Sequence, residues 1–167
     1  IQSLPVERWK EYRGLRLEAL KKEQQAFGSS YRDALKKDDE EWKQVLRNYF
    51  EEKESLMLFA ELGGRLVGMV GAFWQEREKT RHVCNLFGFY VQKKYRNKGI
   101  GKALVSEIIR KLRLKKRFVK VKLNVVSDNE GALALYKKFG FEIVGKLKKE
   151  LKVRKKYYDE YVMELLI

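Results

Sequence analysis

Apolar residues recur at helical spacing in the first third of the chain and at strand spacing after residue 55. Val6 to Ala26 and Asp39 to Phe50 carry apolar side chains every three or four positions among charged ones, which predicts two helices. Phe27 to Tyr31 lies between them, and its Gly-Ser-Ser core is typical of a loop. The N-terminal third is therefore expected to be helical.

From Ser55 the pattern indicates three strands. Leu56 to Glu61 and Arg65 to Trp74 are joined at a two-glycine turn, Gly63-Gly64, which favours a β-hairpin. His82 to Val91 is almost entirely apolar after Asn85. A strand of this kind is usually covered on both faces, so it is expected to lie at the centre of the sheet.

The C-terminal part alternates helices and strands. An apolar stripe from Ile100 to Leu112 predicts a helix, and Val119 to Val125 predicts a strand. A further helix is expected between a cap at Asp128 or Asn129 and a stop at Gly140. The closing strands are expected at Phe141 to Val144 and at Tyr158 to Leu166. This order predicts one α/β domain over residues 1–167, with a mixed, mostly antiparallel, twisted sheet flanked by helices.

The amino-acid composition limits the classes of function that this protein can have. The formal net charge of +15, concentrated in Arg110 to Lys122 and Lys146 to Lys156, favours anionic partners such as nucleic acid or a phosphate-rich cofactor. The single cysteine, Cys84, excludes a disulfide framework and a cysteine-rich zinc site. No apolar run is long enough to cross a bilayer, and no signal-peptide pattern opens the chain. We therefore expect a cytoplasmic protein with no membrane partner and no metal.

A glycine-containing segment, Arg96 to Gly101, joins the central strand to the next helix. Glycines allow a tight turn that presents consecutive backbone N–H groups, and the helix adds the positive end of its dipole, so the segment can bind an anion. It is not a P-loop, which would need Ser or Thr at Ala103. It is not a dinucleotide fingerprint either, which would need Gly or Ala at Leu104. The spacing alone also fits a purely structural turn.

Two separated motifs resemble the GNAT superfamily of acetyl-CoA-dependent N-acetyltransferases. The first is Arg96, Gly99 and Gly101 in the loop after the hydrophobic strand. The second motif comprises Asn129, Ala132, Leu135-Tyr136 and Phe139-Gly140-Phe141. The resemblance covers at least Ser55 to Ile167 and implies the GNAT fold, with residues 6–50 forming the variable, substrate-facing part.

The resemblance implies an acetyl transfer from acetyl-CoA directly to a primary amine. Tyr136 matches the family's general acid, which protonates the CoA thiolate; by position alone it could also be only a core residue. A backbone N–H near Val91 would stabilise the oxyanion. The residues implied in cofactor binding are Phe89, Tyr90, Val91, Arg96, Asn97, Lys98, Gly99, Ile100, Gly101, Lys102 and Asn129.

The general base is not identified. His82 is a candidate because histidine is the usual general base near neutral pH, and a carboxylate could act through water; the carboxylates considered are Glu54, Glu61 and Glu76. Cys84 is expected to be an inert core residue rather than a nucleophile.

The acceptor is expected to be a small-molecule or peptide amine. Phe27 to Tyr31 and Lys155 to Asp159 are expected near it, and Asp159 or Glu160 could hold its ammonium group. The positive net charge does not favour polyamines. A non-catalytic CoA-binding or regulatory domain and a basic nucleic-acid-binding protein remain alternatives. The analogy also allows a homodimer, although the residues themselves do not report oligomeric state.

Overall fold

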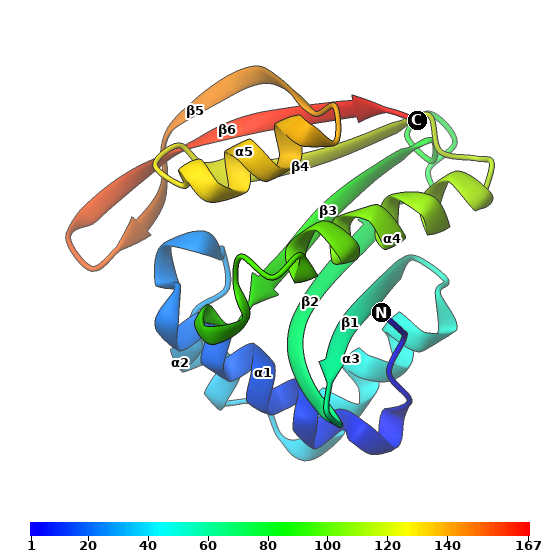
Figure 1. Cartoon of the computed structure of the whole chain (residues 1–167), viewed down its shortest axis with the longest axis vertical. Coiled ribbons are helices and arrows are strands. Elements are labelled where there is room, and N and C mark those ends of the chain that lie inside the picture. The colour runs from blue at the N-terminus through cyan, green and yellow to red at the C-terminus, as the bar shows by residue number, and fades with distance from the viewer.

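A twisted six-stranded sheet forms the centre of the molecule (Figure 1). The computed structural model describes residues 1–167. The strand order is β1-β2-β3-β4-β6-β5, and every neighbouring pair is antiparallel except β3 and β4. The strands are β1 (Ser55–Leu62), β2 (Arg65–Trp74), β3 (Val83–Val91), β4 (Lys120–Val126), β5 (Glu142–Val153) and β6 (Lys156–Leu166). The mixed, mostly antiparallel sheet is confirmed.

Helices cover the two faces of the sheet unequally. On one face lie α1 (Trp9–Lys22), α2 (Tyr31–Leu35) and α3 (Asp39–Glu51); on the other lie α4 (Ile100–Leu114) and α5 (Glu130–Lys138) (Figure 1). Three short 3-10 turns, η1 (Val6–Arg8), η2 (Gln24–Ala26) and η3 (Lys93–Tyr95), complete the chain. None of the helices combines the length and the apolar character that crossing a bilayer requires.

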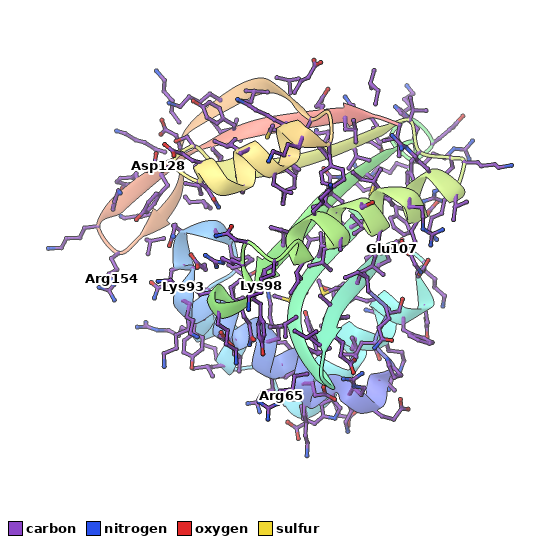
Figure 2. All side chains as sticks on the ribbon, in the orientation of Figure 1. Arg65, Lys93, Lys98, Glu107, Asp128 and Arg154 are labelled. Atoms are coloured by element: carbon purple, nitrogen blue, oxygen red, sulfur yellow. The ribbon has the colours of Figure 1, made fainter.

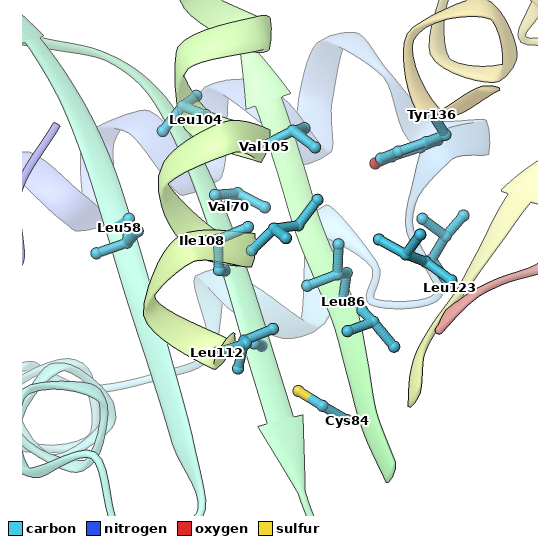
Figure 3. Close-up of a cluster of buried hydrophobic side chains, with 14 of the residues drawn as sticks. Leu58, Val70, Cys84, Leu86, Leu104, Val105, Ile108, Leu112, Leu123 and Tyr136 are labelled. Carbon is cyan, nitrogen blue, oxygen red and sulfur yellow. The ribbon is translucent and has the colours of Figure 1, made fainter. Parts of the chain in front are cut away.

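Two hydrophobic cores follow from the alternation of side chains along the strands. On β1, Leu56 and Leu58 face the core under α4, whereas Met57 and Phe59 face the core under α1 and α3. Figure 3 shows how the buried stripe of α4 packs against β1, β2 and β3. Because both faces of β1 to β3 are buried, these strands read as continuous apolar runs in the sequence.

Several element boundaries differ from those the sequence predicts. The helix expected over Val6 to Ala26 is divided into η1, α1 and η2. The expected loop around Phe27 to Tyr31 contains the start of α2, where Ser30 Oγ caps the helix by accepting the Asp33 N–H at 3.0 Å. The closing strands are longer than predicted and run to a turn at Arg154. Solvent-facing lysines interrupt the apolar residues of the β5–β6 hairpin, so the sequence pattern does not indicate the full length of these strands.

The parallel pair β3 and β4 separates after a short contact. Pairing extends only from Val83 to Asn85 on β3, against Lys120 to Lys122 on β4. Beyond it, β3 stays paired with β2 and β4 stays paired with β6. Near the separation, β3 carries a bulge at Gly88, which has a φ of 65°. The bulge increases the local twist and re-aims the residues that follow, which reach the end of the strand at Val91.

Gly88→Ala is expected to lower stability, because a Cβ strains a residue held at positive φ by about 1–2 kcal/mol. The added Cβ would otherwise make only ordinary contacts, with Met57 Cε at 3.4 Å and Arg16 at 3.9 Å. Thermal and urea unfolding measure the change. Gly145→Ala is the control, since that strand glycine has no positive φ and nothing within 4 Å. Equal stability of the two variants would contradict a strained bulge.

Candidate active site

A cavity of about 770 Å³ lies where β3 and β4 separate. Its walls are the ends of these strands, the start of α4, the inner side of α5, and the turn after α1. Figure 2 shows Lys98 on the loop before α4, and Asp128 on the loop that enters α5. The predicted residues that line this cavity are Phe89, Tyr90, Val91, Arg96, Asn97, Gly99, Gly101, Lys102 and Asn129.

The loop before α4 leaves a run of backbone N–H groups without protein acceptors. Asn97 and Gly99 adopt the left-handed conformation, with φ values of 59° and 80°. The first hydrogen bond of the helix is donated by Ala103 N–H to Gly99 O at 2.9 Å. The amides from Asn97 to Lys102 therefore remain free at the positive end of a helix of 15 residues. This arrangement favours a bound anion.

Arg96 fixes the shape of the loop. Its Nε donates to Val91 O at 2.9 Å, and its Nη2 forms an ion pair with Glu23 Oε1 at 2.6 Å. The guanidinium thus ties the loop to the end of β3 and to the turn after α1. Lys98 lies over the Tyr95 ring at 5.8 Å and does not line the cavity. Among the basic side chains of the loop and the first helical turn, Arg96 and Lys102 reach the cavity wall.

The end of β3 presents a free edge toward β4. Gln92 N–H donates to Val67 O at 2.9 Å, and Tyr90 O lies 3.0 Å from the Cβ position of Gly68, so both groups face β2. Backbone groups alternate in direction along a strand. The N–H of Val91 therefore points to the opposite edge, into the space that β4 vacates.

Tyr136 is buried against the cavity wall. Its ring packs edge-on against Phe89 at 5.9 Å and Phe141 at 5.6 Å between centroids. Figure 3 shows the hydroxyl projecting from α5 toward β3 and α4. Burial raises the pKa of Tyr136 above its usual value, so the phenol stays protonated at neutral pH. Tyr136 itself does not line the cavity, whereas its contact Phe89 does.

Asn129 has a structural role beside its place in the cavity wall. Its Oδ1 accepts the Ala132 N–H at 3.1 Å and caps α5. The predicted cap is thus confirmed, and the same residue lines the cavity.

The remaining predicted residues are less closely associated with the cavity. Lys98 and Ile100 belong to the loop and helix start but do not line it. His82 precedes β3 at the end remote from the cavity, roughly 25 Å along the strand. Burial raises the pKa of the Cys84 thiol to about 12, in keeping with an inert core residue. The carboxylates considered as bases, Glu54, Glu61 and Glu76, also lie outside the cavity wall.

Asp159 and Glu160 are adjacent on β6 and differ sharply. Asp159 accepts the Lys149 N–H at 2.9 Å and pairs with Lys146 at 2.9 Å. Glu160 is 9% exposed and has no cationic partner; its side chain accepts only from Asn124 Nδ2, at 3.1 Å. Burial is the main cause that raises the pKa of Glu160. Of these two carboxylates, only Glu160 lacks a cationic partner.

Glu160→Gln is expected to stabilise the fold at pH 7, because the ionised carboxylate is penalised by burial. A raised pKa in the folded state means that the wild type loses stability as the pH rises through the carboxyl range. The advantage of the variant should therefore vanish below about pH 4. Urea unfolding at a series of pH values measures the difference in stability between the variant and the wild type. Glu164→Gln is the control, since it removes the ion pair with Lys120; a stability gap for Glu160→Gln that is independent of pH would contradict the raised pKa.

Sequence comparisons identify relatives of the chain. The L-amino acid N-acetyltransferase AaaT of Escherichia coli (strain K12) is 36% identical over 106 residues, covering 64% of this chain and 65% of that protein. The spermine/spermidine N(1)-acetyltransferase of Bacillus subtilis (strain 168) is 33% identical over 88 residues, covering 50% of this chain and 57% of that protein. The chain thus matches less than two thirds of the length of either relative.

Solved structures share the whole fold. The acetyltransferase of GNAT family from Streptococcus pneumoniae has a TM-score of 0.89 at 26% identity, covering 99% of this chain and 98% of that chain. The fold is also that of yncA from Salmonella typhimurium, solved with its cofactor acetyl-CoA, at a TM-score of 0.84 and 16% identity over 99% of this chain and 91% of that chain. A family model described as the Acetyltransferase (GNAT) family matches residues 17–141. The chain belongs to the GNAT family of acetyltransferases.

Proposed function

We propose that this protein transfers the acetyl group of acetyl-CoA directly to a primary amine. The observation that carries the proposal is the run of free amides from Asn97 to Lys102, which opens onto the cavity between β3 and β4. Anionic phosphates suit such a run, because the donors and the helix dipole are already in place. Membership of the GNAT family supports the same cofactor.

The cofactor would lie along the free edge of β3. Its diphosphate would bind the amides from Asn97 to Lys102, and Lys102 would add charge. The amide-bearing pantetheine arm would extend beside Phe89, Tyr90 and Val91 in the manner of an added strand. Asn129 would contact it from the start of α5. Acetyl-CoA is thus the co-substrate, and no metal takes part in this proposal.

The chemistry needs a neutral amine, an oxyanion donor and an acid. The amine nitrogen attacks the thioester carbonyl, and the carbonyl oxygen becomes an oxyanion that the Val91 N–H would stabilise. Collapse of this intermediate breaks the C–S bond, and Tyr136 would give its proton to the departing thiolate. The nitrogen releases its proton to water, which restores the proton on the tyrosine. Because burial raises the pKa of Tyr136, the phenol is protonated when the thiolate leaves.

The names of the relatives span more than one class of acceptor. AaaT is named for L-amino acids, and the Bacillus subtilis enzyme for spermine and spermidine. An amine acceptor is common to both. A non-catalytic CoA-binding domain is the competing proposal, and turnover distinguishes the two.

Gly101→Val is expected to weaken acetyl-CoA binding, because a Cβ at this position would already lie 3.1 Å from Phe89 Cζ, and the larger side chain would crowd the free amides. Isothermal titration with acetyl-CoA should show a loss of about 10-fold or more. Gly14→Val is the control, a helix glycine with nothing within 4 Å. Unchanged affinity in a folded Gly101→Val protein would count against this binding site.

Tyr136→Phe is expected to lower kcat by about 10²-fold, the lower range for loss of general acid catalysis, with little change in affinity for acetyl-CoA. Thiol release measures turnover, and unfolding curves check the fold. Phe141→Leu is the control, because it alters the packing around Tyr136 but keeps the hydroxyl. Full turnover by Tyr136→Phe would reject the acid role, and the absence of any turnover by the wild type would favour the non-catalytic alternative.

A further inference from the structure

We infer that the acceptor amine carries a carboxylate, as an α-amino acid does, and that Arg16 binds this carboxylate while Glu160 faces the ammonium group. This inference rests on the acetyl transfer proposed above and names the substrate class of that site.

Arg16 is a cation placed where an apolar residue would be expected. It lies one turn after Tyr12 and one turn before Leu20, both buried, so it occupies the centre of the buried stripe of α1. Its Nη1 is buried without any hydrogen-bond partner. Arg16 as a whole is half-buried, but a buried guanidinium nitrogen without a hydrogen bond is unfavourable. The position therefore calls for an anion that the protein does not supply.

Arg16 does not itself line the cavity but lies next to residues at its wall. Its guanidinium lies 4.7 Å from the centre of the Phe27 ring, and Phe27 lines the cavity. Its Nη1 is 3.9 Å from the Cβ position of Gly88, the bulge that precedes the cavity-lining residues of β3. Stacking on a ring uses the face of a guanidinium and leaves its edge N–H groups free for a bidentate carboxylate.

The entrance on this side is positively charged. A second cavity of about 400 Å³ shares Gln25, Lys156 and Tyr158 with the main one. Its further basic side chains are Lys21, Lys22, Arg154 and Lys155. Of these, Lys22 forms an ion pair, with Glu18. Such a rim attracts an acceptor that bears negative charge and repels a polycation.

Glu160 lines neither of the two cavities, but it places the opposite charge on the same face of the sheet. Met163 and Leu165 of β6 face the core under α4 and α5, so Glu160 faces the side of α1 by alternation. Asn124 accompanies it there, and no cation pairs with it. Arg16 and Glu160 thus offer charges of opposite sign that complement a zwitterion, whereas a polyamine would bring like charge toward Arg16 and the basic rim.

Matched acceptors test the inference. Thiol release is measured for L-amino acids, their amides and spermidine, with wild type, Arg16→Gln and Arg16→Lys. The wild type should prefer an amino acid to its amide, and Arg16→Gln should lower kcat/KM for the amino acid by about 10- to 100-fold, through KM, while sparing the amide. Arg16→Lys should restore part of the loss. Arg65→Gln, which removes the same charge at the exposed β1–β2 turn (Figure 2), should behave as the wild type.

Equal turnover of amides and amino acids, a preference for spermidine, or an equal loss for both acceptors in Arg16→Gln would overturn the inference and leave acetyl transfer standing. Failure of acetyl-CoA to bind would instead reject the proposed function. If acetyl-CoA binds but no amine is turned over, the inference is tested by the change in melting temperature of the CoA-bound protein when an acceptor is added. A shift with amino acids that the amides do not produce, and that Arg16→Gln abolishes, supports the inference; no shift overturns it.

Discussion

The early separation of β3 from β4 is the constraint on which the site depends. Two central strands that part leave backbone N–H and C=O groups without ladder partners, and such groups are costly when buried. Each strand keeps its outer partner, β2 or β6, so the sheet survives the gap. The gap is bounded by the start of α4, by α5 and by the turn after α1. It is a space lined with directed donors rather than an apolar void.

Several residues hold the fold and shape the site through the same contacts. Arg96 donates hydrogen bonds to Val91 O and to the Glu23 carboxylate, and these bonds fix a loop whose own amides stay free. Asn129 caps α5 with its side chain while lining the cavity. Gly88 bends β3 so that the end of the strand leaves the plane of its former partner. The free backbone N–H groups of this loop lie together where an anion can bind them. The polar side chains around them, Arg96 and Asn129, form their hydrogen bonds within the protein.

The parts of the site that sequence reasoning found are those encoded locally. Gly99 and Gly101 lie within one turn, and Asn129 precedes its helix directly, so the motifs of the resembling family locate them along the chain. Arg16 and the Gly88 bulge depend on which helix face meets the sheet and on strand register, neither of which a local pattern reports. The β5 strand was predicted too short for a related reason, since its solvent-facing lysines resemble a charged loop.

The choice between Asp159 and Glu160 shows why net charge is a poor guide to the acceptor. The two carboxylates are neighbours in a chain of net charge +15, and composition would pair both with lysines. The pleat of β6 sends them to opposite faces. Asp159 meets Lys146 and the Lys149 amide, which lower its pKa, whereas Glu160 is turned toward the face that α1 overlooks and stays unpaired. A buried carboxylate without a cation is a standing cost to the fold. In the acceptor binding inferred above, a substrate ammonium beside Glu160 would compensate that cost.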